Sequence, residues 1–162
     1  MILSAQSIRK RCNPCVGSPM IEPFVERGVH EIGMSFGLSS CGYDLRLLET
    51  TTILPGQYML GSSLERFSIP NDLVMHIRDK SSWARQGIFV QNTQAEPGWR
   101  GWLTLEISNN SLQPVIIATG TPICQVVFEM LDEPTELAYS GKYQDQGPQA
   151  YEWIKEKVGT HG

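Results

Sequence analysis

Short apolar segments with strand-like alternation recur along most of this chain, and turn-forming residues separate them. The predicted strands span residues 42–48, 57–62, 65–68, 73–77, 89–91, 103–109, 115–118 and 125–130. The turn formers are Pro55-Gly56, Pro70-Asn71-Asp72, Pro97-Gly98, Asn109-Asn110 and Thr119-Gly120. Many short strands at such spacing are typical of a barrel or sandwich of mainly antiparallel strands. The sequence therefore predicts an all-β domain with only short helices.

Helical signals are few and short. Ser4 can cap a helix over residues 5–11, and a second helix is expected from Ser81-Ser82 to about Gln86, with Ser81 as its cap. Residues 13–37 are rich in glycine and proline, which indicates loops and short strands, and a last short helix is expected over residues 151–158. We expect one domain over residues 1–139. We expect residues 140–162 to form a polar tail that serves as a lid and is mobile when no ligand is bound.

Composition and charge limit the range of functions. The chain has 162 residues, 41% apolar and 19% charged, which suits one globular domain. A net charge of −4 gives no basic footprint for a nucleic-acid partner. No apolar run approaches the roughly 18 residues of a membrane span, and the N-terminus lacks the apolar core of a signal peptide. We therefore expect a cytoplasmic protein that contacts neither nucleic acid nor membrane.

A protein-held metal is weakly supported. Cys12 and Cys15 have the spacing of a metal-binding pair, but no second pair follows them and the three histidines are scattered. Reduced, partly buried thiols are the favoured interpretation, so no zinc and no protein metal site are expected.

A single carboxylate lies in the strand predicted at residues 103–109. Alternation places Leu103, Leu105 and Ile107 on one face, and Trp102 shares the other face with Glu106. A solvent-facing glutamate on an antiparallel strand is the simplest interpretation of this strand by itself. The tryptophan beside it indicates instead that this face lines a cleft or a subunit interface.

Four residues at the start of the second predicted helix suit a phosphate. Free backbone N–H groups, the Ser81 and Ser82 hydroxyls and the Lys80 ammonium would converge there, and Arg85 follows about one turn later. An ordinary helix cap beside a solvated lysine is the alternative explanation.

Five motifs, in order between residues 40 and 149, resemble those of the dCTP deaminase family, a branch of the trimeric dUTPase-like superfamily. They are GYDLRL at 42–47, DKSSWARQG at 79–87, AEPGWRG at 95–101 followed by LTLE at 103–106, TPICQVVF at 121–128 and YSGKYQDQGP at 139–148. The resemblance implies a distorted β-barrel of the dUTPase-like type. It further implies a homotrimer with active sites between subunits, each closed by a C-terminal segment.

The resemblance also implies a reaction, the hydrolytic deamination of dCTP to dUTP and ammonia, which feeds dUMP and dTTP synthesis. Glu106 would be the general acid/base, Arg85 would orient Glu106 or the attacking water, and Ser81 would complete the catalytic group. The implied substrate-binding residues are Lys80, Ser82, Asn92, Thr93, Glu96, Trp99, Gln125, Tyr139, Lys142 and Gln146. Lys80, Ser82 and Ser81 would hold phosphates together with Tyr139, Lys142 and Gln146 from the tail. Glu96 and Trp99 would border the deoxyribose, and Gln125 would lie near the phosphates or the sugar. Mg²⁺ is expected on the triphosphate rather than in a protein cage.

Two substitutions depart from the family pattern. Lys80 stands where the motif has arginine and lacks its planar fork, and Glu96 stands where it has aspartate. Several alternatives therefore stay open: a bifunctional dCTP deaminase and dUTP diphosphatase, a plain dUTPase, and a non-catalytic nucleotide-binding module. Glu106 argues against the last two, because neither requires a carboxylate there. Preference for a modified cytosine and inhibition by dTTP are left open.

Overall fold

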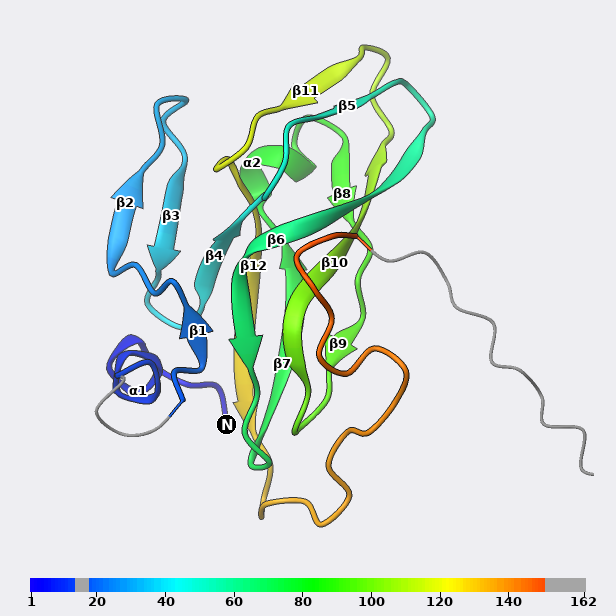
Figure 1. Ribbon diagram of the computed structural model, residues 1–162. Helices are drawn as coiled ribbons and strands as arrows, with labels where there is room; N and C mark the ends of the chain where they lie inside the picture. The colour runs from blue at the N-terminus through cyan, green and yellow to red at the C-terminus, as the bar shows by residue number, and fades with distance from the viewer. Residues whose placement is uncertain (14–17, 151–162) are drawn as a thin grey trace, which may run out of the picture.

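The computed structural model describes residues 1–13 and 18–150, and it is built almost entirely from β-strands (Figure 1). Its two helices are α1 (Ala5–Arg11) and α2 (Ser81–Ala84). The strands are β1 (Ile21–Glu22), β2 (Arg27–Val29), β3 (Ser35–Leu38), β4 (Tyr43–Arg46), β5 (Thr51–Ile53), β6 (Tyr58–Ser68), β7 (Leu73–Asp79), β8 (Ile88–Val90), β9 (Gln94–Ala95), β10 (Arg100–Asn109), β11 (Val115–Ile117) and β12 (Pro122–Met130). The all-β prediction is confirmed.

The strands form three sheets that share one core. A six-stranded sheet has the order β2-β3-β4-β12-β7-β9, and a four-stranded sheet has the order β1-β6-β10-β8. The remaining pair, β11 and β5, forms a small third sheet. All pairings between named strands are antiparallel. Tyr43, Phe67 and Phe128 are the largest fully buried side chains. The core therefore draws on both large sheets, as in a closed or nearly closed barrel.

The longest pairing joins β6 to β10, the strand that carries Glu106. Sequence patterns predicted two strands at residues 57–62 and 65–68, but the structure has one strand, β6. The register against β10 shifts between Trp102 and Thr104, which marks a bulge. At this point the Ser63 hydroxyl accepts a 2.8 Å hydrogen bond from the Leu103 N–H and donates one of 2.6 Å to the Glu65 carbonyl. A buried serine thus replaces ladder bonds, so the strand continues where its polar sequence suggested a break.

Both predicted helices are present, with differences at their ends. Ser4 is the N-cap of α1, but its hydroxyl contacts Ser7 Oγ at 3.3 Å and makes no cap hydrogen bond. The N-cap of α2 is Lys80, so the prediction of Ser81 as cap was wrong by one residue. Helix α2 also ends at Ala84, before the expected Gln86. The helix expected over residues 151–158 lies outside the described residues.

The chain beyond β12 folds back along the barrel. Figure 1 shows this segment, in orange, passing β9 and β10. The Thr135 N–H donates to the Asn71 carbonyl at 3.0 Å, the Tyr139 N–H donates to the Pro97 carbonyl at 2.8 Å, and Gln146 forms a parallel bridge with Gly101. The described part of the tail therefore has a defined course on its own barrel. Neither helix of the described residues is long and apolar enough to cross a membrane.

Candidate active site

Glu106 lies in the middle of β10, on the face that the alternation predicted. Leu105 and Ile107 are buried on the opposite face, while Glu106 is half-buried. Leu103, at the register shift, is also buried, but it lines the same pocket as Glu106. Across the sheet, Glu106 pairs with Leu60 of β6. Tyr58 lies two residues before Leu60 on the same strand. Burial is the main cause that raises the pKa of its phenol, and the charge of the Glu106 carboxylate raises it further. The carboxylate therefore lies on a partly apolar surface with an aromatic ring near it.

A pocket of about 580 Å³ opens over this face. Its lining consists of Tyr58, Leu60, Asn92, Thr93, Gln94, Ala95, Glu96, Trp99, Leu103, Thr104, Glu106, Tyr139, Tyr143 and Gln146. A volume of this size suits a small organic ligand or nucleotide. Seven residues predicted for the site line it: Asn92, Thr93, Glu96, Trp99, Glu106, Tyr139 and Gln146.

The segment between β8 and β9 forms one wall of this pocket. Val90 is the last residue of β8 and pairs with Ile107 of β10. One residue later the Gln91 N–H donates to the Glu106 carbonyl at 2.8 Å. The chain then leaves β10, and β9 pairs with β7 instead. Near the point of departure, the Asn92 side chain binds the β10 backbone through two hydrogen bonds.

A tight turn at Pro97-Gly98 carries Trp99 into the pocket. Gly98 has φ of +84°, a backbone conformation that residues other than glycine rarely adopt. A Cβ built there would lie 2.8 Å from the Ala138 Cβ, so only glycine allows the tail to pass so close. The buried Trp99 indole donates its N–H to the Tyr143 carbonyl at 2.8 Å. The turn therefore joins the pocket wall to the tail.

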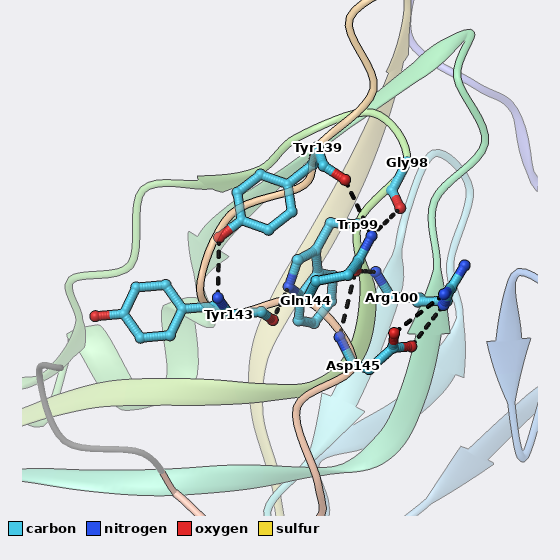
Figure 2. A network of polar contacts seen from close by, with 7 residues as sticks. All are labelled: Gly98, Trp99, Arg100, Tyr139, Tyr143, Gln144 and Asp145. Atoms are coloured by element: carbon cyan, nitrogen blue, oxygen red, sulfur yellow. Dashed lines mark hydrogen bonds and ion pairs between the residues drawn. The ribbon is translucent and has the colours of Figure 1, made fainter. Parts of the chain in front are cut away.

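The tail is held over the pocket rim by a dense set of polar contacts (Figure 2). Gln144 Nε2 donates to the Gly98 carbonyl at 2.9 Å and to the Tyr139 carbonyl at 3.1 Å. The Arg100 guanidinium binds the Asp145 carboxylate through Nε–Oδ1 at 2.5 Å and Nη2–Oδ2 at 3.0 Å. The side-chain hydrogen bond from Arg100 is the main cause that lowers the pKa of Asp145. These bonds link the segment to the Pro97-Gly98 turn and to the start of β10.

Lys142 and Gln146 lie on this tail in different settings. Gln146 is buried, lines the pocket and accepts the Trp102 N–H through its backbone carbonyl at 3.2 Å. Lys142 is exposed, and its Nζ lies 5.2 Å from the centre of the Tyr143 ring, which lines the pocket. Gln146 thus lies on the inner side of the pocket rim, and Lys142 lies on its outer side.

The Lys80 ammonium is already bound within the barrel. Its Nζ lies 2.8 Å from Asp44 Oδ2, and both side chains are almost fully buried, at 10% and 7% exposure. The other Asp44 oxygen accepts a 3.2 Å hydrogen bond from Gln125 Nε2. Ser35 Oγ completes the cluster, 3.4 Å from Lys80 Nζ. The sequence predicted that Lys80 binds phosphate. In the structure the Lys80 charge instead neutralises the buried Asp44 carboxylate, and this contact fixes the start of α2.

Helix α2 is anchored by its tryptophan and exposes its polar residues. The buried Trp83 indole donates to the Pro122 carbonyl at 2.8 Å. Ser81 and Arg85 are exposed, and Ser82 is half-buried. The pocket over Glu106 contains none of these three residues, nor Gln125. The chain therefore brings together Glu106, the pocket wall and the tail, but the residues of α2 do not line this pocket.

Seven of the pocket residues were not among the predicted site residues, namely Tyr58, Leu60, Gln94, Ala95, Leu103, Thr104 and Tyr143. Thr104 lies on the same face of the strand as Glu106, so the alternation could have identified it as a pocket residue. Tyr58 and Leu60 lie opposite Ser108 and Glu106 across the sheet. Their place depends on the register of β6 against β10, which no short-range pattern encodes.

The described residues contain no group of three or more histidine, cysteine, aspartate or glutamate side chains placed to hold a metal ion. Cys12 is buried, and burial is the main cause that raises the pKa of its thiol to about 12. A thiol with such a pKa is a poor metal ligand at neutral pH. Cys15 lies outside the described residues.

Comparison with known proteins identifies the family. Residues 44–131 match the model of the dCTP deaminase-like family. The chain is 36% identical over 159 residues to a dCTP deaminase of Acidobacterium capsulatum, covering 78% of this chain and 87% of that protein. It is 34% identical over 163 residues to a dCTP deaminase of Campylobacter fetus, covering 81% and 88%.

Solved structures agree on the fold. A dCTP deaminase from Agrobacterium tumefaciens superposes with a TM-score of 0.64 at 18% identity, over 80% of this chain and 48% of that chain. An EIAV dUTPase superposes with a TM-score of 0.52 at 16% identity, over 62% and 84%. The dUTPase-like fold expected from the motifs is confirmed. On the strength of the family match and these relatives, the chain belongs to the dCTP deaminase-like family.

Proposed function

We propose that this protein is an enzyme that deaminates dCTP hydrolytically to dUTP and ammonia. The observation that carries this proposal is the position of Glu106, a carboxylate on a rigid strand inside a nucleotide-sized pocket. The relatives that match over most of the chain are named dCTP deaminases. A plain diphosphatase needs no carboxylate at this strand position, whereas deamination needs a group that moves protons.

The proposed reaction adds water across the N3=C4 double bond of cytosine and then breaks the C4–N4 bond. Glu106 takes a proton from the water as its oxygen bonds to C4, and this proton passes to N3. Glu106 next transfers the second water-derived proton to the amine. The C4–N4 bond then breaks, ammonia leaves, N3 keeps its proton and C4 retains a carbonyl. One water is consumed for each dCTP, and the carboxylate is regenerated.

The remaining site residues have proposed roles that match their places. Glu96 and Trp99 border the deoxyribose from the turn at Pro97-Gly98, and Thr93 faces the base from the pocket wall. Tyr139, Lys142 and Gln146 approach the triphosphate from the tail. Mg²⁺ would bind through the triphosphate oxygens and offset their charge, with no protein cage.

We also propose that the active enzyme is a homotrimer. Support comes from the division of the site, because α2 carries Ser81, Ser82 and Arg85 away from the pocket of its own subunit. A neighbouring subunit would bring its α2 and Gln125 to this pocket, where Arg85 orients Glu106 or the water. We expect the enzyme in the cytoplasm, and inhibition by dTTP remains a prediction to be tested in the same assay.

A second candidate is a bifunctional enzyme that also hydrolyses dUTP to dUMP and pyrophosphate. It is favoured by Glu96, which places a second carboxylate in the pocket.

The test of both candidates is to incubate the protein with dCTP and Mg²⁺ and to separate the products. Ammonia with dUTP supports the deaminase, and ammonia with dUMP and pyrophosphate supports the bifunctional enzyme. Unchanged dCTP would overturn both, and hydrolysis of added dUTP alone would indicate a dUTPase.

A further inference from the structure

The side chain of Asn92 takes the place of a β-strand beside Glu106. Its Oδ1 accepts a 2.9 Å hydrogen bond from the Glu106 N–H, and its Nδ2 donates a 2.7 Å hydrogen bond to the Thr104 carbonyl. Both backbone groups lie on the edge of β10 that pairs with β8. They lie beyond the end of that pairing, because β8 ends at Val90. The amide therefore continues the ladder for two more bonds, although the backbone has turned away.

These two bonds tie the pocket wall to the strand that carries the carboxylate. Asn92 lines the pocket together with Thr93 and Gln94, its successors along the wall. The Gln91 N–H adds a third bond to the same strand, 2.8 Å from the Glu106 carbonyl. The Glu106 backbone is thus held through both its N–H and its carbonyl. A carboxamide makes this double contact because it has both a donor and an acceptor.

We propose that Asn92 is a positioning residue, which fixes the Glu106 backbone and the pocket wall relative to each other. This inference rests on the proposed deamination, and it assigns Asn92 a different task from the substrate binding that the motifs implied. With one amide proton and the oxygen engaged by β10, the side chain is oriented by the protein rather than by a ligand. Proton transfer needs the carboxylate within hydrogen-bond reach, and a displacement of about 1 Å can slow a reaction about a hundredfold.

Three variants test the proposal in the full-length enzyme with dCTP and Mg²⁺. Asn92→Ala removes both bonds, and we expect kcat to fall about 10- to 100-fold while KM changes less than about threefold. Asn92→Asp keeps the acceptor but sets a carboxylate against the Thr104 carbonyl. The matched control is Asn110→Ala, since Asn110 is exposed, directly follows the same strand and binds Ser108 Oγ through its side chain. We expect wild-type values for it.

The pH profile separates positioning from general loss of structure. In the Asn92→Asp variant, the protonated form of the introduced carboxyl group can donate to the Thr104 carbonyl, as the amide does. We therefore expect the ratio of Asn92→Asp kcat to wild-type kcat to rise as the pH falls, and a flat ratio contradicts the proposal. This measurement still decides if the alanine variant does not fold. An increase of tenfold or more in KM with unchanged kcat would overturn the proposal in favour of direct substrate binding.

Hydrogen exchange at the Glu106 amide tests the geometry without catalysis. We expect this amide to exchange faster in Asn92→Ala than in the wild type, with no change in Asn110→Ala. Unchanged exchange contradicts the inference even if dCTP is not the substrate. Absence of ammonia release by the wild type would instead contradict the proposed function, so the two failures are distinguishable.

Discussion

Replacing Lys80 with methionine tests whether this lysine supports the barrel or binds phosphate. The variant keeps most of the side-chain volume but removes the charge that lies 2.8 Å from Asp44 Oδ2. Asp44 is then a buried carboxylate without a cation, and it retains hydrogen bonds of 3.2 Å each from Ser35 and Gln125. Those two bonds stabilise the carboxylate in part, which limits the expected loss.

The expected loss follows from the burial of the pair. Removing one partner of a buried ion pair lowers the free energy of unfolding by about 3–5 kcal/mol. Because Asp44 keeps two hydrogen bonds, we expect a loss of about 3 kcal/mol for Lys80→Met. For a chain of this size, that corresponds to a decrease of about 6–12 °C in Tm. Urea unfolding monitored by circular dichroism would measure the difference. In the double variant Asp44→Asn with Lys80→Met, neither position of the pair carries a charge, and we expect most of the stability to return.

A different result would refute this reasoning. If Lys80→Met unfolds within about 0.5 kcal/mol of the wild type, the size of an ordinary surface substitution, the lysine does not stabilise the barrel. If its KM for dCTP also rises tenfold or more, Lys80 is a phosphate ligand, as its motif first indicated.

Three further predictions concern the tail and the assembly. A chain ending at Leu137 should keep its fold, because the last strand ends at Met130, but bind dCTP more weakly; equal affinity in a calorimetric titration contradicts the lid. The lowered pKa of Asp145 means that its contribution to holding the tail is present above the ordinary value of 3.8 and is lost as the pH falls through the lowered value. Hydrogen exchange of residues 142–146 should therefore show an acid step that Asp145→Asn lacks. Light scattering should give a trimeric mass, and full activity in a monomer contradicts the shared site.

Local patterns were sufficient for one side of the site. The alternation in β10 placed Glu106 correctly, because a strand's period of two is independent of its partners. The turn at Pro97-Gly98 was also predictable, since few residues other than glycine adopt its backbone conformation. The motif order then indicated the fold that the structure and the comparisons confirm.

Contacts between distant segments were not predictable in this way. The Lys80–Asp44 pair joins residues 36 positions apart, and nothing near Lys80 in sequence shows that its charge is neutralised. The tail was expected to be mobile without ligand because it has little apolar surface, and that mobility stays a prediction. Its defined course depends on Arg100 and Trp99, about 44 residues earlier, and on the Gln144 amide. Whether nucleotide changes that course stays a prediction.

The most direct test of the account is the substitution Glu106→Gln. Glutamine keeps the size and much of the polarity of the side chain, but it cannot take a proton from water. We expect dCTP binding within about threefold of the wild type and ammonia release slower by at least about a hundredfold, the scale for loss of a general acid/base. Turnover near the wild-type rate would show that Glu106 does not carry the chemistry, and the proposed mechanism would be wrong.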